Sequence, residues 1–173
     1  MGIIGQHKQD QTSGVGAEVL FVTDSMLGKL ARWLRALGYD THYESHWEPG
    51  IIDRHVKEGR RLITRQKMRA EEFRDSLLVN SDHVGEQLTE LKWMVPLSPD
   101  RSDLFSRCLL CNAPLRSIKV EEARDNLPEY VFYQNMGGIR FCPSCGRYYW
   151  PGTHRTRMAR QLEDWGFMDR PKK

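Results

Sequence analysis

Four cysteines stand in the chain as two pairs with the same internal spacing. The pairs are Cys108-Leu109-Leu110-Cys111 and Cys142-Pro143-Ser144-Cys145. Two residues between paired thiolates let both sulfurs reach one tetrahedral cation, and two such pairs complete a closed site of the structural type. The 30 residues between the pairs exceed the usual zinc-finger spacing, but a longer loop adds little closure entropy. The spacing therefore predicts a structural Zn²⁺, and the alternatives are two disulfides or a redox dithiol.

Carboxylates follow the segments that are expected to be strands. Asp24 comes directly after a short apolar run, Glu44 and Glu48 follow a second candidate strand, and Asp82 follows a fourth. Because parallel strands end at one edge of a sheet, we expect Asp24, one of the two glutamates and Asp82 to form a catalytic group, in which Asp24 and Asp82 hold Mg²⁺ or Mn²⁺. A water on such an ion can serve as the nucleophile of a nuclease.

Each carboxylate also has a simpler interpretation. Asp24 is a natural N-cap for the helix that follows it, because its oxygen can accept a backbone N–H. Glu44 and Glu48 have the simpler interpretation of solvated loop charges, and Asp82 could be the N-cap of the last helix. Capping and metal binding are compatible roles for Asp24.

Basic residues are concentrated in two places: Lys29, Arg32 and Arg35 in the first predicted helix, and the segment from Arg140 onward. The net charge is +3, but from Arg140 onward eight basic residues face three acidic ones, in a segment that also carries Tyr148, Tyr149 and Trp150. Basic groups that alternate with aromatic rings suit phosphate contact and base stacking on single-stranded RNA. Alternatively, Lys29, Arg32 and Arg35 are a solvated helix face and the later basic residues are a solvated tail. The aromatic rings could instead pack the core of a small domain. The predicted RNA-binding residues are Lys29, Arg32, Arg35, Arg65, Arg147, His154, Arg155 and Arg157.

Alternating strands and helices must position these groups. Apolar, β-prone segments are expected as strands at 18–23, 39–43, 61–64 and 76–79, and apolar periodicity predicts helices at 26–37, 51–58, 68–73 and 83–93. This alternation predicts an α/β fold with a mainly parallel sheet flanked by helices, followed by a small zinc-ribbon domain.

The predicted organisation has five parts: a flexible tail at 1–17, the α/β domain at 18–95, a linker at 96–104, the zinc ribbon at 105–158 and a basic segment at 159–173. The composition is 39% hydrophobic and 28% charged, and no apolar run approaches the ~18 residues of a membrane span. The first residues lack the basic and apolar blocks of a signal peptide. We therefore expect a cytoplasmic protein with no membrane partner.

The residues from about 20 to 158 resemble a known family, the PIN-fold ribonuclease domain with an appended zinc ribbon called the Mut-seven C-terminal domain. The resemblance rests on the segment at 21–35, on Gly38-Tyr39-Asp40, on the segments at 59–65 and 106–112, and on Cys142 to Gly146 followed by Tyr149 to His154. It implies a PIN-like sheet and a metal-dependent endoribonuclease whose carboxylates lie at the strand ends.

The chain departs from this family at one informative position. Gln66 follows Thr64-Arg65 where the family usually continues to Asp, and Pro49-Gly50 stand where acids are usual. The resemblance therefore leaves Glu48 as the nearest acidic candidate to act with Asp24 and Asp82. An amide offers an oxygen but neither charge nor proton acceptance.

Three hypotheses follow. The first is a metal-dependent endoribonuclease of RNA processing or decay, and the second is a catalytically impaired adaptor that binds RNA, a ribosome or tRNA. The third is a toxin-like nuclease restrained by a protein partner.

Overall fold

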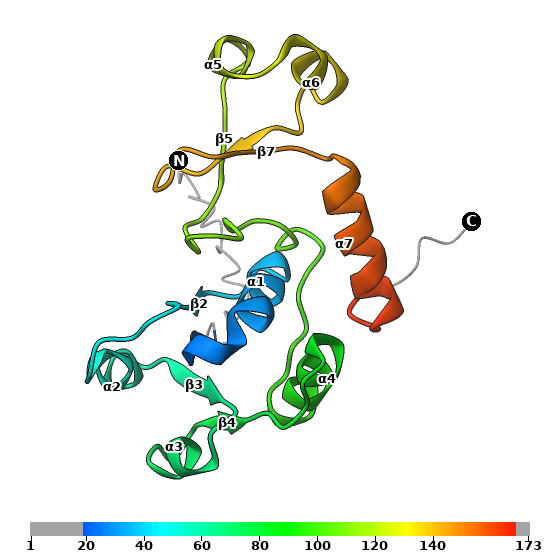
Figure 1. Cartoon of the computed structure of the whole chain (residues 1–173). Helices are drawn as coiled ribbons and strands as arrows, with labels where there is room; N and C mark the ends of the chain where they lie inside the picture. The colour runs from blue at the N-terminus through cyan, green and yellow to red at the C-terminus, as the bar shows by residue number, and fades with distance from the viewer. Residues whose placement is uncertain (1–18, 169–173) are drawn as a thin grey trace, which may run out of the picture.

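The computed structural model describes residues 19–168, so the predicted tail at 1–17 and the basic residues beyond 168 lie outside the described part. Its first half is built on a parallel sheet with the strand order β2-β1-β3-β4 (Figure 1). The strands are β1 (Phe21–Thr23), β2 (Thr41–His42), β3 (Arg61–Thr64) and β4 (Leu77–Leu78). The predicted parallel α/β sheet is therefore confirmed, although β2 and β4 are shorter than expected.

Helices cover both faces of this sheet. A single 3-10 turn, η1 (Ser25–Leu27), leads into the first helix. The helices of this half are α1 (Gly28–Ala36), α2 (Ile51–Lys57), α3 (Lys67–Glu71) and α4 (Val84–Met94). Alternate residues of β1 and β3 face opposite sides, as the two-residue period of a strand requires. Phe21 and Ile63 therefore pack against α1 and α4, whereas Val22 and Leu62 pack toward Ile52 of α2.

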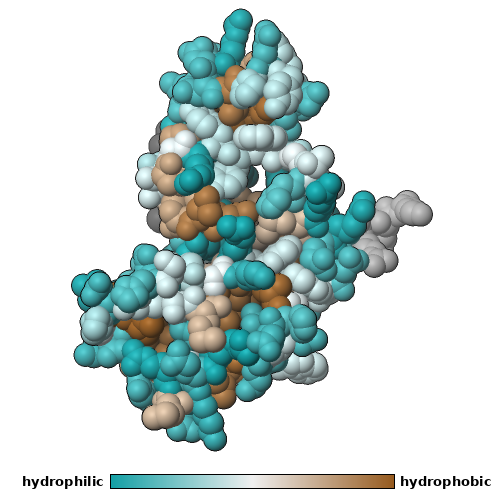
Figure 2. Space-filling model, in the orientation of Figure 1, coloured by the Kyte–Doolittle hydropathy of each residue, from teal (hydrophilic) through white to brown (hydrophobic). Residues whose placement is uncertain are grey.

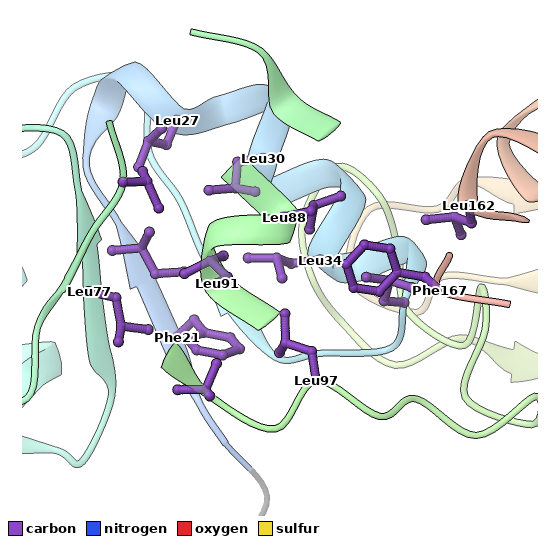
Figure 3. Close-up of a cluster of buried hydrophobic side chains, with 14 residues drawn as sticks. Phe21, Leu27, Leu30, Leu34, Leu77, Leu88, Leu91, Leu97, Leu162 and Phe167 are labelled. Carbon is purple, nitrogen blue, oxygen red and sulfur yellow. The ribbon is translucent and has the colours of Figure 1, made fainter. Parts of the chain in front are cut away.

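The larger core lies between α1, α4 and the sheet. Leu30 and Leu34 of α1 and Leu88 and Leu91 of α4 are fully buried there (Figure 3). These positions recur every three or four residues, which places them on one helix face. The core fixes α1 across the sheet and so determines where the residues that flank α1 project.

The second half is an antiparallel ribbon with a helical insertion. Its strands are β5 (Arg116–Ser117), β6 (Arg140–Phe141) and β7 (Tyr148–Tyr149), paired in the order β5-β6-β7. The insertion between β5 and β6 forms α5 (Val120–Asn126) and α6 (Glu129–Gln134), which project away from the parallel sheet (Figure 1). A small core of Ala123, Phe132 and Ile139 holds it together.

The last helix, α7 (Thr153–Asp164), returns from the ribbon to the first domain. Leu162 and Phe167 are buried in the core formed by α1 and α4 (Figure 3). Trp165 packs edge to face on Trp33, with ring centroids 4.7 Å apart. Residues 159–168 are thus not a separate basic segment, and the boundary expected at 158 falls within a helix.

The expected linker at 96–104 is also packed against the protein. Leu97 is buried in the main core, and the backbone N–H of Phe105 donates to the carbonyl of Ala36 at 2.8 Å. This connection holds the ribbon close to the end of α1. In the described part of the chain, no helix combines the length and the apolar character needed to cross a membrane.

Candidate functional site

The four cysteines form one cluster, as predicted. Their sulfur atoms all lie within 4.8 Å of one another, and none of the cysteines is in a disulfide. The clustering of all four sulfurs is the arrangement that a tetrahedral Zn²⁺ requires, and a four-thiolate set is typical of structural zinc. The cluster therefore fits a structural zinc site and excludes the alternative of two disulfides in this structure.

The two cysteine pairs have the same backbone geometry. Asn112 and Gly146 each follow the second cysteine of a pair, and each has a φ angle of 71°. Their N–H groups donate to the carbonyls of Cys108 and Cys142 at 3.0 Å. Glycine and asparagine adopt this left-handed conformation most readily, which explains why these residues close the two turns.

A tyrosine supports the cluster from outside. The hydroxyl of Tyr149 lies 3.0 Å from the sulfur of Cys108. Groups in this position orient thiolates and tune the affinity for the metal. Burial and the neighbouring cysteine sulfurs raise the pKa of Tyr149, so it is protonated and able to donate to a thiolate.

Arg35 binds the first cysteine pair to the parallel sheet and does not face RNA. Its side chain is only 3% exposed, so the prediction that it contacts RNA is wrong. One guanidinium nitrogen donates to the carbonyls of Leu109 and Leu110 at 3.2 and 2.7 Å, and Nε donates to that of Thr41 at 2.9 Å. The last turn of α1 meets the ribbon at this point, which turns Arg35 inward while Arg32 stays exposed.

Asn112 completes this junction. Its side-chain oxygen accepts the N–H of Thr41 at 3.0 Å, and its amide donates to Asp40 at 2.8 Å. Asp40 also pairs with Arg60 and Arg107. Burial raises the pKa of Asp40, but hydrogen bonds from Arg60 and Asn112 and the charges of Arg60 and Arg107 outweigh this effect and hold it below its ordinary value. The zinc ribbon and the sheet thus share one buried polar network.

Asp24 lies at the carboxyl end of β1 with both oxygens engaged. One oxygen accepts the N–H of Met26 at 2.9 Å, which confirms the N-cap interpretation. The other accepts the hydroxyl of Thr64 at 2.7 Å and the N–H of Arg65 at 3.1 Å. The carboxylate is 4% exposed. It therefore joins β1, the turn before α1 and the end of β3.

The other predicted catalytic residues lie apart from this arrangement. Asp82 has 79% of its side chain exposed and pairs with Arg65 at 2.6 Å. Glu48 and Gln66 are exposed as well. Arg65 is thus directed toward Asp82, and its Nε is buried with no hydrogen-bond partner in the described part of the chain. Among residues 19–168, the four cysteines are the only group of His, Cys, Asp or Glu with ligand atoms close enough to hold a metal.

A pair of histidines beside this edge was not predicted from the sequence. The rings of His42 and His55 lie 4.3 Å apart, and both pack edge to face near Trp47. Burial lowers the pKa of His42 to about 4 from its ordinary value of 6.5, and the neighbouring His55 lowers it too. No regular spacing in the sequence connects positions 42 and 55, because the sheet brings them together.

This pKa shift predicts acid sensitivity. Because the folded-state pKa of His42 is depressed, its contribution to stability is complete above about pH 6.5 and is lost as the pH falls toward 4. We expect His42→Gln to flatten this part of the stability profile. Urea unfolding at closely spaced pH values between 7.5 and 4 measures the effect, and His154→Gln, at an exposed histidine, is the control. Parallel profiles for His42→Gln and the wild type would contradict the prediction.

A cleft lies between α1 and the zinc ribbon. It has a volume of about 410 Å³, within the usual range for ligand pockets. Arg32 of α1 faces residues of the ribbon and of α7 across it. The predicted RNA-binding residues that line it are Arg32, Arg147, His154 and Arg155; Lys29 lines an adjoining hollow and Arg157 another.

Arg140 also lines this cleft, although the sequence did not single it out. Burial of the Arg155 side chain lowers the pKa of Arg155, and the positive charge of Arg140 lowers it further. The guanidinium of Arg155 stacks 5.0 Å from the ring centroid of Phe105. Within residues 19–168, Arg32, Arg140 and Arg155 form no ion pair with a carboxylate. These three arginines thus bring to the cleft positive charge that no carboxylate of the described residues neutralises in an ion pair.

A comparison with protein families matches residues 19–162 to the Mut7-C RNAse domain. The match begins before β1 and ends within α7, so it includes the sheet, the ribbon and the helix that joins them. The chain belongs to the Mut7-C RNAse domain family. No curated protein and no solved structure matches it.

Membership in the Mut7-C family supports a ribonuclease-type function and makes RNA the class of substrate or partner. Among residues 19–168, the strand edge of this Mut7-C chain does not bring together a group of acidic ligands for Mg²⁺ or Mn²⁺. Asp24 uses both oxygens for protein hydrogen bonds, Asp82 is paired with Arg65, and the uncharged Gln66 is exposed. The catalytic role of Asp24, Glu48 and Asp82 stays a prediction.

Proposed function

We propose that this protein binds single-stranded RNA in the cleft between α1 and the zinc ribbon and acts as an RNA-binding adaptor. One observation carries the proposal: arginines from α1, β6 and α7 face one cleft, and Arg32, Arg140 and Arg155 form no ion pairs in the described structure. Phosphate groups are the natural counter-charge for such a cleft in a family of RNAse domains.

Aromatic residues in the same cleft suit unpaired bases. Tyr148 and Trp150 line the wall opposite α1, and Trp150 is 37% exposed. Single-stranded RNA can present base faces to such rings, whereas a duplex keeps its bases stacked inside. We therefore propose single-stranded RNA, with tRNA or ribosomal RNA as its source, and we propose a cytoplasmic location.

A neighbouring hollow extends this path toward Asp24. Arg32, His154 and Met158 line both the cleft and this hollow, which also reaches Ser25 and Lys29. Ser25 directly follows Asp24 at the end of β1. RNA in the cleft would thus pass close to the edge of the sheet.

A second candidate is the metal-dependent endoribonuclease of RNA processing or decay. The position of Asp24 favours it, because this carboxylate is held at a strand end beside the proposed RNA path. Cation binding there would require Asp24, which is 4% exposed, to become accessible to the ion. It would also require Asp82 to leave Arg65. The need for both changes places the adaptor ahead of the nuclease.

Reversing one charge in the cleft should weaken RNA binding. We expect Arg32→Glu to raise the Kd for a fluorescent single-stranded RNA at least tenfold and to reduce its salt dependence by about one phosphate contact. Fluorescence anisotropy measures both quantities. Arg124→Glu makes the same charge change at an exposed position of α5 that does not line the cleft, and it should bind like the wild type. Equal loss in both variants would contradict the proposed site.

Cleavage separates the two candidates. The zinc-loaded protein is incubated with RNA in Mn²⁺, in Mg²⁺ and without either ion, beside an identically prepared Asp24→Asn variant. We expect binding without cleavage in every condition. Cutting that needs Mn²⁺ or Mg²⁺ and disappears in Asp24→Asn would establish the nuclease and overturn the adaptor.

A further inference from the structure

The helical insertion forms a second groove beside the cleft. This groove lies between α6 and the start of α7 and has a volume of about 550 Å³. Figure 2 shows the insertion as an upper lobe with a largely hydrophilic outer surface. The residues of the groove that can contact a polar ligand include Tyr130, Gln134, Trp150, Thr156, Arg157 and Arg160.

The groove and the cleft share one wall. Trp150, Gly152 and Thr153 line both of them, so the indole of Trp150 stands at the passage from one to the other. Gly152 makes this close arrangement possible, because a Cβ there would lie 3.0 Å from the indole nitrogen. A strand that leaves the cleft past Trp150 therefore enters the groove.

The exposed groups in the groove match the chemistry of a nucleotide. Tyr130 of α6 is 67% exposed, so its large aromatic ring is accessible to a ligand. Arg157 and Arg160 lie one turn apart on α7, are exposed, and form no ion pair within residues 19–168. Gln134 is exposed, and its amide is a group that can bond to a base edge. An aromatic ring, an amide and two cations together suit a base with its flanking phosphates.

We infer that this groove is a second RNA subsite, which holds the part of a single strand that continues beyond the cleft. Tyr130 stacks on a base, and Arg157 and Arg160 contact the phosphates on either side. The inference rests on the proposed RNA binding in the cleft and extends it: the protein binds longer single strands more tightly than short ones.

The test compares two lengths of unstructured RNA by fluorescence anisotropy. An oligomer of roughly four nucleotides fills the cleft alone, and one of roughly twelve reaches the groove as well. We expect Tyr130→Ala to weaken binding of the long oligomer about tenfold, which is the loss of one base stack. Binding of the short oligomer should stay unchanged.

Two matched controls keep the test specific. Tyr133 is also on α6 and is 55% exposed, but it does not line the groove, so Tyr133→Ala should bind both oligomers normally. Arg160→Glu should act like Tyr130→Ala, whereas Arg124→Glu should not.

Equal effects of Tyr130→Ala and Tyr133→Ala on the long oligomer would overturn the second subsite and leave the cleft intact. Long and short oligomers that bind with equal affinity to the wild type would overturn it too. Failure of the wild type to bind either length would overturn the proposed function together with this inference.

Discussion

Replacing Cys142 with serine is expected to unfold the zinc ribbon and to destabilise the parallel sheet. Cys142 is fully buried, and a three-sulfur set cannot close the site. Structural zinc in small domains contributes about 10–16 kcal/mol of apparent binding energy, which is also folding energy. The ribbon has only a small apolar core of Ala123, Phe132 and Ile139 to replace it.

The effect should extend beyond residues 105–158 because the first cysteine pair is bonded to the sheet. Without a formed Cys108–Cys111 turn, Arg35 loses the carbonyls of Leu109 and Leu110, and Thr41 loses Asn112. Limited proteolysis with mass spectrometry, alongside measurement of bound zinc, should show cleavage in the ribbon first and in the segment around β2 next.

Ser144→Ala is the control, because Ser144 lies in the same turn but is exposed. It should keep its zinc and its resistance to protease. A Cys142→Ser protein, or a zinc-free wild type, that keeps a protected ribbon would contradict the prediction.

Arg35→Met is expected to cost about 3 kcal/mol of unfolding free energy. Methionine fills much of the same space but donates no hydrogen bonds, so three backbone carbonyls at a buried junction lose a charged donor. Burial lowers the pKa of the guanidinium, although the nearby Cys108 and Cys111 oppose this shift, so the site keeps a cation at some desolvation cost. The hydrogen bonds from Arg35 to the three carbonyls offset this desolvation cost.

Urea unfolding of Arg35→Met beside Arg32→Met measures this contribution. Arg32 lies nearly one turn earlier on α1 and is exposed, so its replacement should change stability by less than about 0.5 kcal/mol. Arg32→Met should instead weaken RNA binding. If the two variants were equally stable, Arg35 would have no anchoring role.

The zinc cluster and Arg35 show how far the fold and the candidate site could be predicted from the sequence. The zinc cluster was predicted because two short local spacings define it, and the sheet was predicted because apolar runs alternate with helical periodicity. Arg35 was not assigned correctly, since Lys29, Arg32 and Arg35 share a charge and a helix but not an environment. Only the docking of the ribbon distinguishes Arg35 from Arg32.

The strand edge shows a second limit. The sequence predicted that Asp24 directly follows a strand and caps the next helix, because both features are local in sequence. The pairing of Asp82 with Arg65 depends on a loop conformation, and the edge-to-face contact of His42 with His55 depends on how α2 lies beside β2. No periodicity in the sequence encodes either contact. The sequence showed two separate groups of basic residues, one in the first helix and one from Arg140 onward, but not the cleft between them. The cleft forms because α7 returns to the first domain.

The contacts of Thr41 have a further consequence. β2 is one of the two outer strands of the sheet, and its open side is covered where Asn112 accepts the N–H of Thr41 and Arg35 donates to the carbonyl of Thr41. An uncovered strand of this kind is a template for pairing with another chain. Zinc bound by the cysteines would hold the Cys108–Cys111 turn over β2 and keep this strand edge covered, so we expect the zinc-free protein to self-associate more than the zinc-loaded protein.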